Sequence, residues 1–149
     1  MAAIKYARGT KLMLKFGDGA EPEVFAHMCS FILSKSITFT ANENTSTIPD
    51  CDDPEAIAWE VSEITSKRIT LQGSGTLNTP DFDALFEWWD AGASRNMKIV
   101  LDVTAADGGA ILTGAWKITG MEMSGEEGEK VQISATFGSD GPVVKTANT

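Results

Sequence analysis

The sequence predicts a mainly β fold: an antiparallel β-sandwich or small barrel, with one flanking α-helix at about residues 80–91 and a long acidic loop at about residues 43–64. Three observations lead to this prediction. Apolar and polar residues alternate through most of the chain, one short segment has helical spacing instead, and one stretch has neither pattern. Alternating strands bury one face and expose the other, as strands of antiparallel sheets do.

The alternating segments are separated by turn signals. Gly and Asp cluster at 17–19 and 107–109, and Glu and Gly at 126–128, as is common in tight turns. The predicted strands lie at about residues 12–16, 24–28, 37–41, 69–77, 97–103, 112–120 and 131–137.

The helical segment carries a single apolar stripe with the spacing i, i+3, i+4 and i+7, formed by Phe82, Leu85, Phe86 and Trp89. Thr79 is a suitable N-cap, and Pro80 suits the first helical position. Gly92 is suited to end the helix. We expect the stripe to pack on the sheet, although a partner-binding helix would show the same pattern.

The stretch 43–64 is unusually long for a connection in a compact domain, and such loops tend to be functional or disordered. It contains seven acidic residues, and no Lys or Arg occurs between Lys35 and Lys67. It also contains Trp59 and four aliphatic residues, which a disordered linker would not need. We therefore expect this segment to become ordered against something else, such as another chain.

Length and charge narrow the class of protein. The 149 residues suit a single domain, 1–149, and the net charge of −9 argues against tight phosphate binding and against docking on anionic membranes. No run of residues is long and apolar enough to cross a membrane. The first residues lack the apolar run of a signal peptide, and two cysteines favour free thiols in a cytosolic setting.

No arrangement of residues indicates catalysis or a cofactor. His27 is the only histidine, and its place in an alternating segment favours a structural role. A zinc site made of His27, Cys29 and Cys51 with Asp50 or Asp52 would match no common ligand spacing. The acidic run 50–55 lacks the spacing of a calcium loop, and no carboxylate pair stands out. We expect a protein that is not an enzyme and has no metal or cofactor.

The order of these elements resembles the tail tube proteins of long-tailed bacteriophages, including the TP901-1-like major tail proteins. Four segments carry the resemblance: 65–75, the helix 82–89 with Gly92, 112–122 and 131–141. The resemblance implies a structural virion protein whose copies form six-membered rings that stack into a hollow tube, the conduit for viral DNA. It also implies contacts with tape measure, tail terminator and tail-tip proteins, and a place in the virion tail after assembly in the host cytoplasm.

Other functions would fit the same class of fold. The tail tube proteins are similar to the Hcp-type tube of type VI secretion, so fold alone does not separate the two. A carbohydrate-binding β-sandwich module would need exposed aromatic residues, and only Trp59 and Trp88 among the tryptophans fall outside the predicted core stripes. A hydrolase would need a catalytic constellation, and none is evident.

Three candidate surfaces follow from the residues read beside the resemblance. We expect the acidic loop to contact the next ring through Asn44, Asp50, Asp52, Asp53, Glu55, Trp59 and Glu60. We expect a basic N-terminal segment to contact the acidic loop of a neighbouring copy through Lys5, Arg8, Lys11 and Lys15. A polar strand face is a candidate for the lumen, formed by Ser36, Thr38, Thr40, Arg68, Thr70 and Gln72, with a similar contribution from Thr119, Gln132, Ser134 and Thr136.

Overall fold

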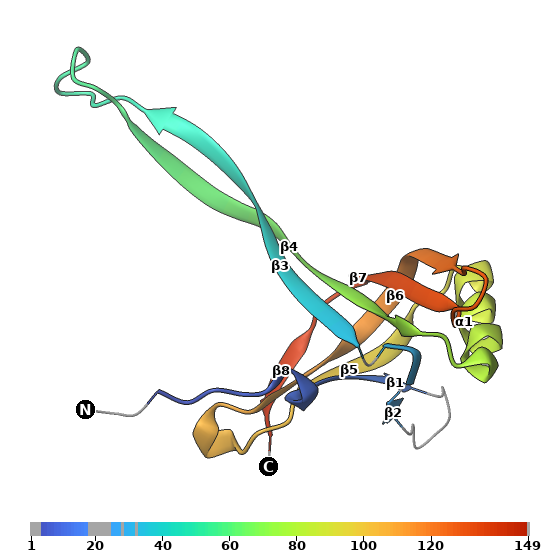
Figure 1. Ribbon diagram of the computed structural model, residues 1–149. Coiled ribbons are helices and arrows are strands. Elements are labelled where there is room, and N and C mark those ends of the chain that lie inside the picture. Colours follow the sequence, from blue (N-terminus) through green and yellow to red (C-terminus); the bar gives the residue numbers. More distant parts are fainter. Residues whose placement is uncertain (1–3, 18–24, 28, 32, 149) are drawn as a thin grey trace.

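The computed structural model describes residues 4–17, 25–27, 29–31 and 33–148. The described chain is mainly β with one α-helix, which confirms the predicted fold class (Figure 1). Its strands and helix are β1 (Leu12–Gly17), β2 (Phe25–His27), β3 (Ser34–Ile48), β4 (Trp59–Thr76), α1 (Thr79–Ala91), β5 (Arg95–Leu101), β6 (Ala110–Ser124), β7 (Gln132–Ser139) and β8 (Val144–Ala147). Three short 3₁₀ turns, η1 (Gly9–Lys11), η2 (Cys29–Phe31) and η3 (Ala105–Asp107), complete it.

All the strand pairs are antiparallel, and the strands join in one curled sheet in the order β2-β1-β5-β6-β7-β4-β3 (Figure 1). The strand β8 pairs with the first residues of β6, and the sequence analysis missed it because Val144–Ala147 is short and exposed. β7 lies between β6 and β4, so the last long strand runs beside the first long hairpin.

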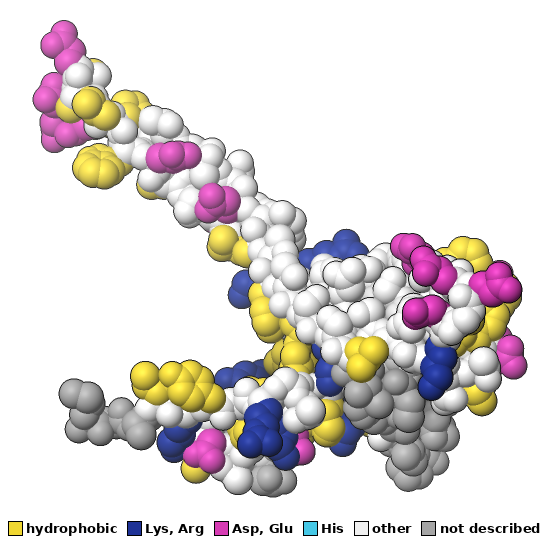
Figure 2. Space-filling model, viewed as in Figure 1, with side chains coloured by type: hydrophobic (Ala, Val, Ile, Leu, Met, Phe, Trp, Pro, Cys, Tyr) yellow, Lys and Arg dark blue, Asp and Glu magenta, His cyan; other side chains and the backbone are white. Residues whose placement is uncertain are grey.

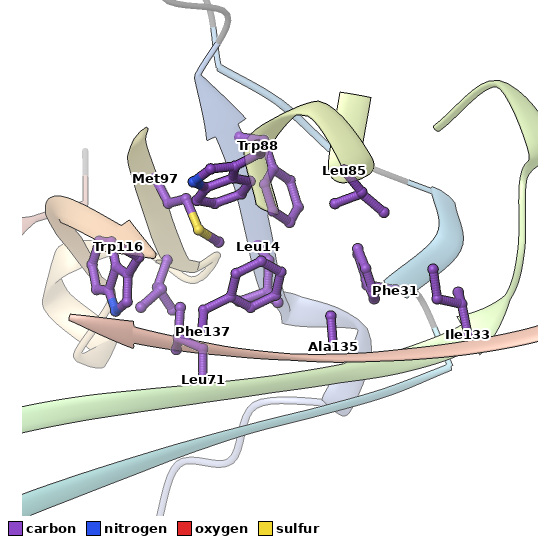
Figure 3. Packing of buried hydrophobic residues seen from close by; sticks show 12 residues of the cluster. Leu14, Phe31, Leu71, Leu85, Trp88, Met97, Trp116, Ile133, Ala135 and Phe137 are labelled. Carbon is purple, nitrogen blue, oxygen red and sulfur yellow. The ribbon is translucent and has the colours of Figure 1, made fainter. Parts of the chain in front are cut away.

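The core lies on one face of this curled sheet and is rich in aromatic side chains (Figure 3). The Phe137 ring is central: its centroid lies 5.7 Å from Phe16, 5.9 Å from Phe31 and 5.4 Å from Trp88. These spacings are typical of favourable aromatic pairs. Because these rings come from β1, η2, α1 and β7, the cluster holds together segments distant in sequence.

The helix packs through a narrower stripe than we predicted. Leu85 and Trp88 are buried, whereas Phe86 is 44% exposed and Trp89 50% exposed. The prediction that Phe86 and Trp89 belong to the core was therefore wrong, as was the exclusion of Trp88. The reason lies in the partner surface: the Phe16 and Phe137 rings surround Trp88, whose indole Nε1 donates to the Ala93 carbonyl at 2.9 Å.

The helix N-terminus is held by a residue from another segment. Asn78 is the N-cap and Thr79 is already the first helical residue, so the predicted Thr79 cap was wrong. The buried Ser30 hydroxyl donates to the Asp81 carboxylate and accepts from the Asn78 N–H, both at 2.9 Å. Gly92 ends the helix with a φ of 66°, as its position predicts.

The predicted acidic loop at 43–64 is mostly strand. β3 continues to Ile48 and β4 begins at Trp59, so only residues 49–58 connect them. This part of the hairpin has both faces in solvent, so neither face needs an apolar row and the sequence shows no alternation. Strand pairing satisfies the backbone groups there without a buried face.

Candidate assembly surfaces

The hairpin of β3 and β4 projects from the body as an arm, defined here as residues 41–67 (Figure 1). The pairing of β4 with β7 ends at Thr70 opposite Gly138, and beyond that point β4 pairs only with β3 among the described strands. Every side chain of the arm is exposed except Ala58, which is half-buried. A two-stranded ribbon without a covered face is at best marginally stable in water, so the arm lacks the burial that supports the body.

The outer end of the arm presents large apolar side chains to solvent. Trp59 is 84% exposed, Ile48 lies directly opposite it, and Val61 follows on the same face. We call Ile48, Trp59 and Val61 the tip row. Figure 2 shows apolar and acidic side chains gathered at this end of the molecule. An exposed apolar cluster of this kind typically marks an interaction site.

Acidic side chains surround the tip row. Four of the predicted stacking residues lie in the connecting turn: Asp50, Asp52, Asp53 and Glu55. Trp59 and Glu60 begin β4, so they lie at the same end, but Asn44 lies farther down the arm opposite Glu63. The Asp52 N–H donates to the Asp50 carboxylate at 3.0 Å, which is a local turn contact. None of these acids forms an ion pair within the described residues.

A β-bulge lies partway along the arm. The pairing register shifts between Asn42 and Glu43, where Thr65 of β4 has no opposite residue. The Thr65 hydroxyl donates to the Asn42 carbonyl at 3.1 Å, and the Asn42 amide donates to the Ser66 hydroxyl at 2.8 Å. A one-residue shift moves the side chains of β4 between Thr65 and the tip of the arm to the other face. In the pairing register, the tip row therefore lies on the face opposite Phe39 and Ile69.

The six predicted lumen residues share one face of the sheet. They form three directly opposite pairs, Ser36 with Gln72, Thr38 with Thr70 and Thr40 with Arg68. β7 extends this face, because Thr136 lies opposite Gln72 and Ser134 opposite Ser74. The face is the one turned away from the buried residues of β4 and β7.

Arg68 lies across a glycine of β7. A Cβ atom at Gly138 would collide with the Arg68 guanidinium, so a side chain there would displace the flexible end of the arginine. Gly138 itself is buried beneath it. The guanidinium therefore lies over β7, near the point where the arm leaves the body.

The basic N-terminal segment is partly neutralised within its own chain. The Lys5 ammonium lies 2.8 Å from the Asp107 carboxylate, and the Lys11 ammonium lies 4.0 Å from that of Asp102. The hydrogen bond from Lys5 lowers the pKa of Asp107, with smaller contributions from Thr104 and from the charge of Lys5. Arg8 and Lys15 form no ion pair within the part of the chain that the structure describes.

The structure does not bring the considered metal ligands together. Cys51 is exposed in the turn of the arm, whereas the backbones of His27 and Cys29 lie in the body; their side chains are outside the described residues (Figure 1). Within the described residues, no cluster of three or more His, Cys, Asp or Glu could hold a metal ion. Likewise, no helix in the described part of the chain is long and apolar enough to span a membrane.

The fold is similar to that of several solved tail structures. The tail of an empty gene transfer agent particle, refined with C6 symmetry, matches with a TM-score of 0.75 at 18% identity, over 95% of this chain and 100% of that chain. The SPP1 tail tube matches with a TM-score of 0.67 at 12% identity, over 96% and 80%. The tube-terminating cap of the anti-feeding prophage matches with a TM-score of 0.64 at 14% identity, over 99% and 95%.

The sequence itself assigns the family. No curated protein is similar enough in sequence to serve as a relative. The sequence model of the phage tail tube proteins, however, matches residues 6–145, which is nearly the whole chain. The chain belongs to the phage tail tube protein family, whose members are structural components of the tail.

Proposed function

We propose that this protein assembles into six-membered rings that stack into the tail tube of a virion, and that the arm makes the contact between successive rings. The observation that carries the proposal is the arm, whose outer end exposes the tip row beside acidic residues. The number six is supported by the C6 symmetry of the similar gene transfer agent tail. Identical copies in a ring use a heterologous contact, and stacking requires a second one.

The energetics of the arm favour this role. Burying apolar surface contributes roughly 25 cal/mol per Å² removed from water. Trp59, Ile48 and Ile57 are exposed in the single subunit, so this stabilisation is gained only when a partner covers them. β3 is also an edge strand of the sheet in the described chain, and its outer backbone groups are open to another chain. In the isolated subunit, the surfaces that an assembly would bury are therefore exposed to solvent.

The polar sheet face suits the lumen of a DNA conduit. Its side chains on β3, β4 and β7 are mostly hydroxyls and amides, with Arg68 as the only cation among the predicted six. Strong binding of DNA depends on many Lys and Arg contacts with phosphates. A face of this kind, on a protein with a net charge of −9, lets DNA pass without holding it.

Other contacts belong to the same proposal. Arg8 and Lys15 remain available for the acidic arm of a neighbouring copy, while Lys5 and Lys11 are already neutralised. A tape measure protein would fill the tube before DNA does, and tail terminator and tail-tip proteins would close its ends. The similarity to a tube-terminating cap supports the contact with a terminator. Assembly would take place in the host cytoplasm.

Shortening the arm tests the proposal. Residues 46–61 are replaced by Asn-Gly, a two-residue turn that can join Thr45 to Ser62 because these two residues lie directly opposite each other. We expect the circular dichroism spectrum and the thermal unfolding of the body to be kept, and negative-stain electron microscopy to show no tubes. A matched control replaces Glu126 and Glu127, two exposed acids of the body, by Gln and keeps the tubes. Normal tubes from the shortened protein would contradict the role of the arm.

A further inference from the structure

A groove with a volume of about 420 Å³ lies where the arm joins the body. Its lining combines apolar and cationic residues, among them Phe39, Lys67, Arg68, Ile69, Pro142 and Val143. Phe39 is 66% exposed, which is unusual for a large aromatic residue that does not line an interaction site. Figure 2 shows Lys or Arg side chains at the base of the arm and acidic side chains at its tip.

The groove exists because the body stops covering the sheet before the apolar row ends. Along β4, Leu71 is fully buried and Ile69 is partly buried against the core. Phe39 lies directly opposite Ile69 and continues the same row beyond the last pair of β4 with β7. The Ile69 N–H donates to the Ser139 hydroxyl at 3.0 Å, which fixes the end of β7 beside the groove. The apolar row that lines the core therefore extends by one residue, Phe39, into the solvent-exposed part of the sheet.

We propose that this groove receives the tip of the arm from a second copy of the chain. The inference rests on the proposed function and names the surface that the arm binds. Lys67 lies opposite Ala41, on the same strand face as Phe39 and Ile69. It forms no ion pair within the described residues, so its charge is open to a partner. The tip offers the complementary chemistry: Trp59 and Ile48 for the apolar residues of the groove, and the acids of the turn for Lys67.

The positions of the two surfaces make the contact repeatable. The tip row lies at the outer end of the hairpin and Phe39 at its base, nine residues earlier on β3, which corresponds to about 30 Å of strand. The two surfaces do not overlap, so one copy binds a neighbour through its groove and another through its tip. Such a head-to-tail contact does not end with a pair of copies but continues through successive layers.

The N-terminal segment is the competing receptor for the acidic tip. Two of its four basic residues, Lys5 and Lys11, already lie beside carboxylates of their own chain. The groove has an unpaired cation, Lys67, next to apolar residues that can contact Trp59. The groove therefore accounts for both the charge and the apolar character of the tip.

A photo-crosslinking experiment identifies the occupant of the groove. Phe39 is replaced by p-benzoylphenylalanine, which keeps an aromatic ring at an exposed position, and assembled protein is irradiated and digested for mass spectrometry. We expect crosslinks between position 39 of one copy and residues 48–60 of another, and none in dilute monomer. Crosslinks from intact tubes to any other segment, or to none, overturn the inference while the ring-stacking role of the arm stands. Loss of tubes in the shortened-arm protein is the separate test of that role.

A charge reversal provides a second test that does not depend on the crosslinker. We expect Lys67→Glu to raise the protein concentration needed for tube assembly about tenfold at low salt. Combining it with Asp53→Lys in the turn should restore assembly, because each mutant surface again meets its opposite charge. The matched control is Lys130→Glu, a reversal at an exposed cation of the body just before β7, and it should shift assembly far less. Unchanged assembly of Lys67→Glu, or no restoration by Asp53→Lys, overturns the inference.

Discussion

The strands β3 and β4 run through both the body and the arm of this protein, but their side chains are buried differently in the two regions. Within the body, β4 lies between β3 and β7, and Leu71 is fully buried. Beyond Thr70 the same strand has only β3 beside it among the described strands (Figure 1), and its side chains are exposed from Arg68 out to Trp59. The pairing of β3 with β4 continues across this boundary, but the body no longer covers the two strands beyond it. The comparison teaches that a single hairpin can contribute to the core at one end and present an interaction surface at the other.

The largest effect on folding is expected in the body. Phe137→Ala removes a fully buried ring that packs against Phe16, Phe31 and Trp88. We expect the free energy of unfolding to fall by about 3–5 kcal/mol, the usual cost of deleting a core aromatic side chain. Urea denaturation followed by tryptophan fluorescence measures it. A loss below about 1 kcal/mol would show that this cluster is not the main support of the fold.

A substitution in the arm should affect assembly rather than folding stability. Trp59→Ala changes a side chain that is 84% exposed, so the free energy of unfolding should stay within about 0.5 kcal/mol of wild type. Tube assembly should nevertheless be lost, because the largest apolar side chain of the tip is gone. Urea denaturation and negative-stain microscopy of one preparation measure both properties.

Trp89→Ala is the matched control for that prediction, since Trp89 is a half-exposed tryptophan on the helix of the body. It should leave tubes intact. If Trp89→Ala also abolished tubes, the helix would be an assembly surface as well, and the contrast between arm and body would weaken.

Two glycines of the body allow a smaller and more local test. A Cβ at Gly73 would lie 3.1 Å from the Phe31 ring, so Gly73→Ala should lower stability by about 1–3 kcal/mol through overpacking. Gly120, on β6, has nothing within 4 Å of its Cβ position, so Gly120→Ala should change stability by less than about 1 kcal/mol. Thermal unfolding compares the two. Equal effects would mean that the crowding beneath β4 has no role in stability.

The smallest effect concerns the N-terminal segment. The pKa of Asp107 is lowered in the folded protein, so its pair with Lys5 favours folding above the unfolded pKa and loses that effect as the pH falls through the folded pKa. Lys5→Met should raise the pKa of Asp107 toward its ordinary value, as followed by NMR titration. Because the pair is exposed, the urea midpoint should hardly change. Arg8→Met is the control and should leave that pKa unchanged.

The sequence analysis predicted the secondary structure well, but it predicted poorly which side chains are buried. Alternation located the strands except β8, and the spacing of the helix located α1 within a residue or two. It placed Phe86 and Trp89 in the core, because a helical stripe shows which residues share a face but not how wide the partner surface is. It also described residues 43–48 and 59–64 as loop, because a ribbon with two exposed faces carries no periodic signal.

The candidate surfaces were predicted unevenly for similar reasons. Alternation predicted that the six residues of the proposed lumen face share one strand face, and they pair across β3 and β4. The acidic turn was found from charge. The groove was not found, because Phe39 and Val143 are more than 100 residues apart in the chain and neither has a distinctive local pattern. The shift of the tip row to the other face depends on one unpaired residue, Thr65, which alternation cannot reveal.

The sequence by itself determined the periodic features of this protein: the strands, the helix, the acidic segment with its apolar residues, and the family. These depend on neighbours a few positions apart, and a linear chain displays such relations directly. Only the tertiary structure decided where the body stops covering β4 and which side chains of α1 are buried. It also decided that Phe39 and Val143 line the same groove. Those outcomes depend on which distant segments lie against each surface, and burial is set by that coverage rather than by residue type.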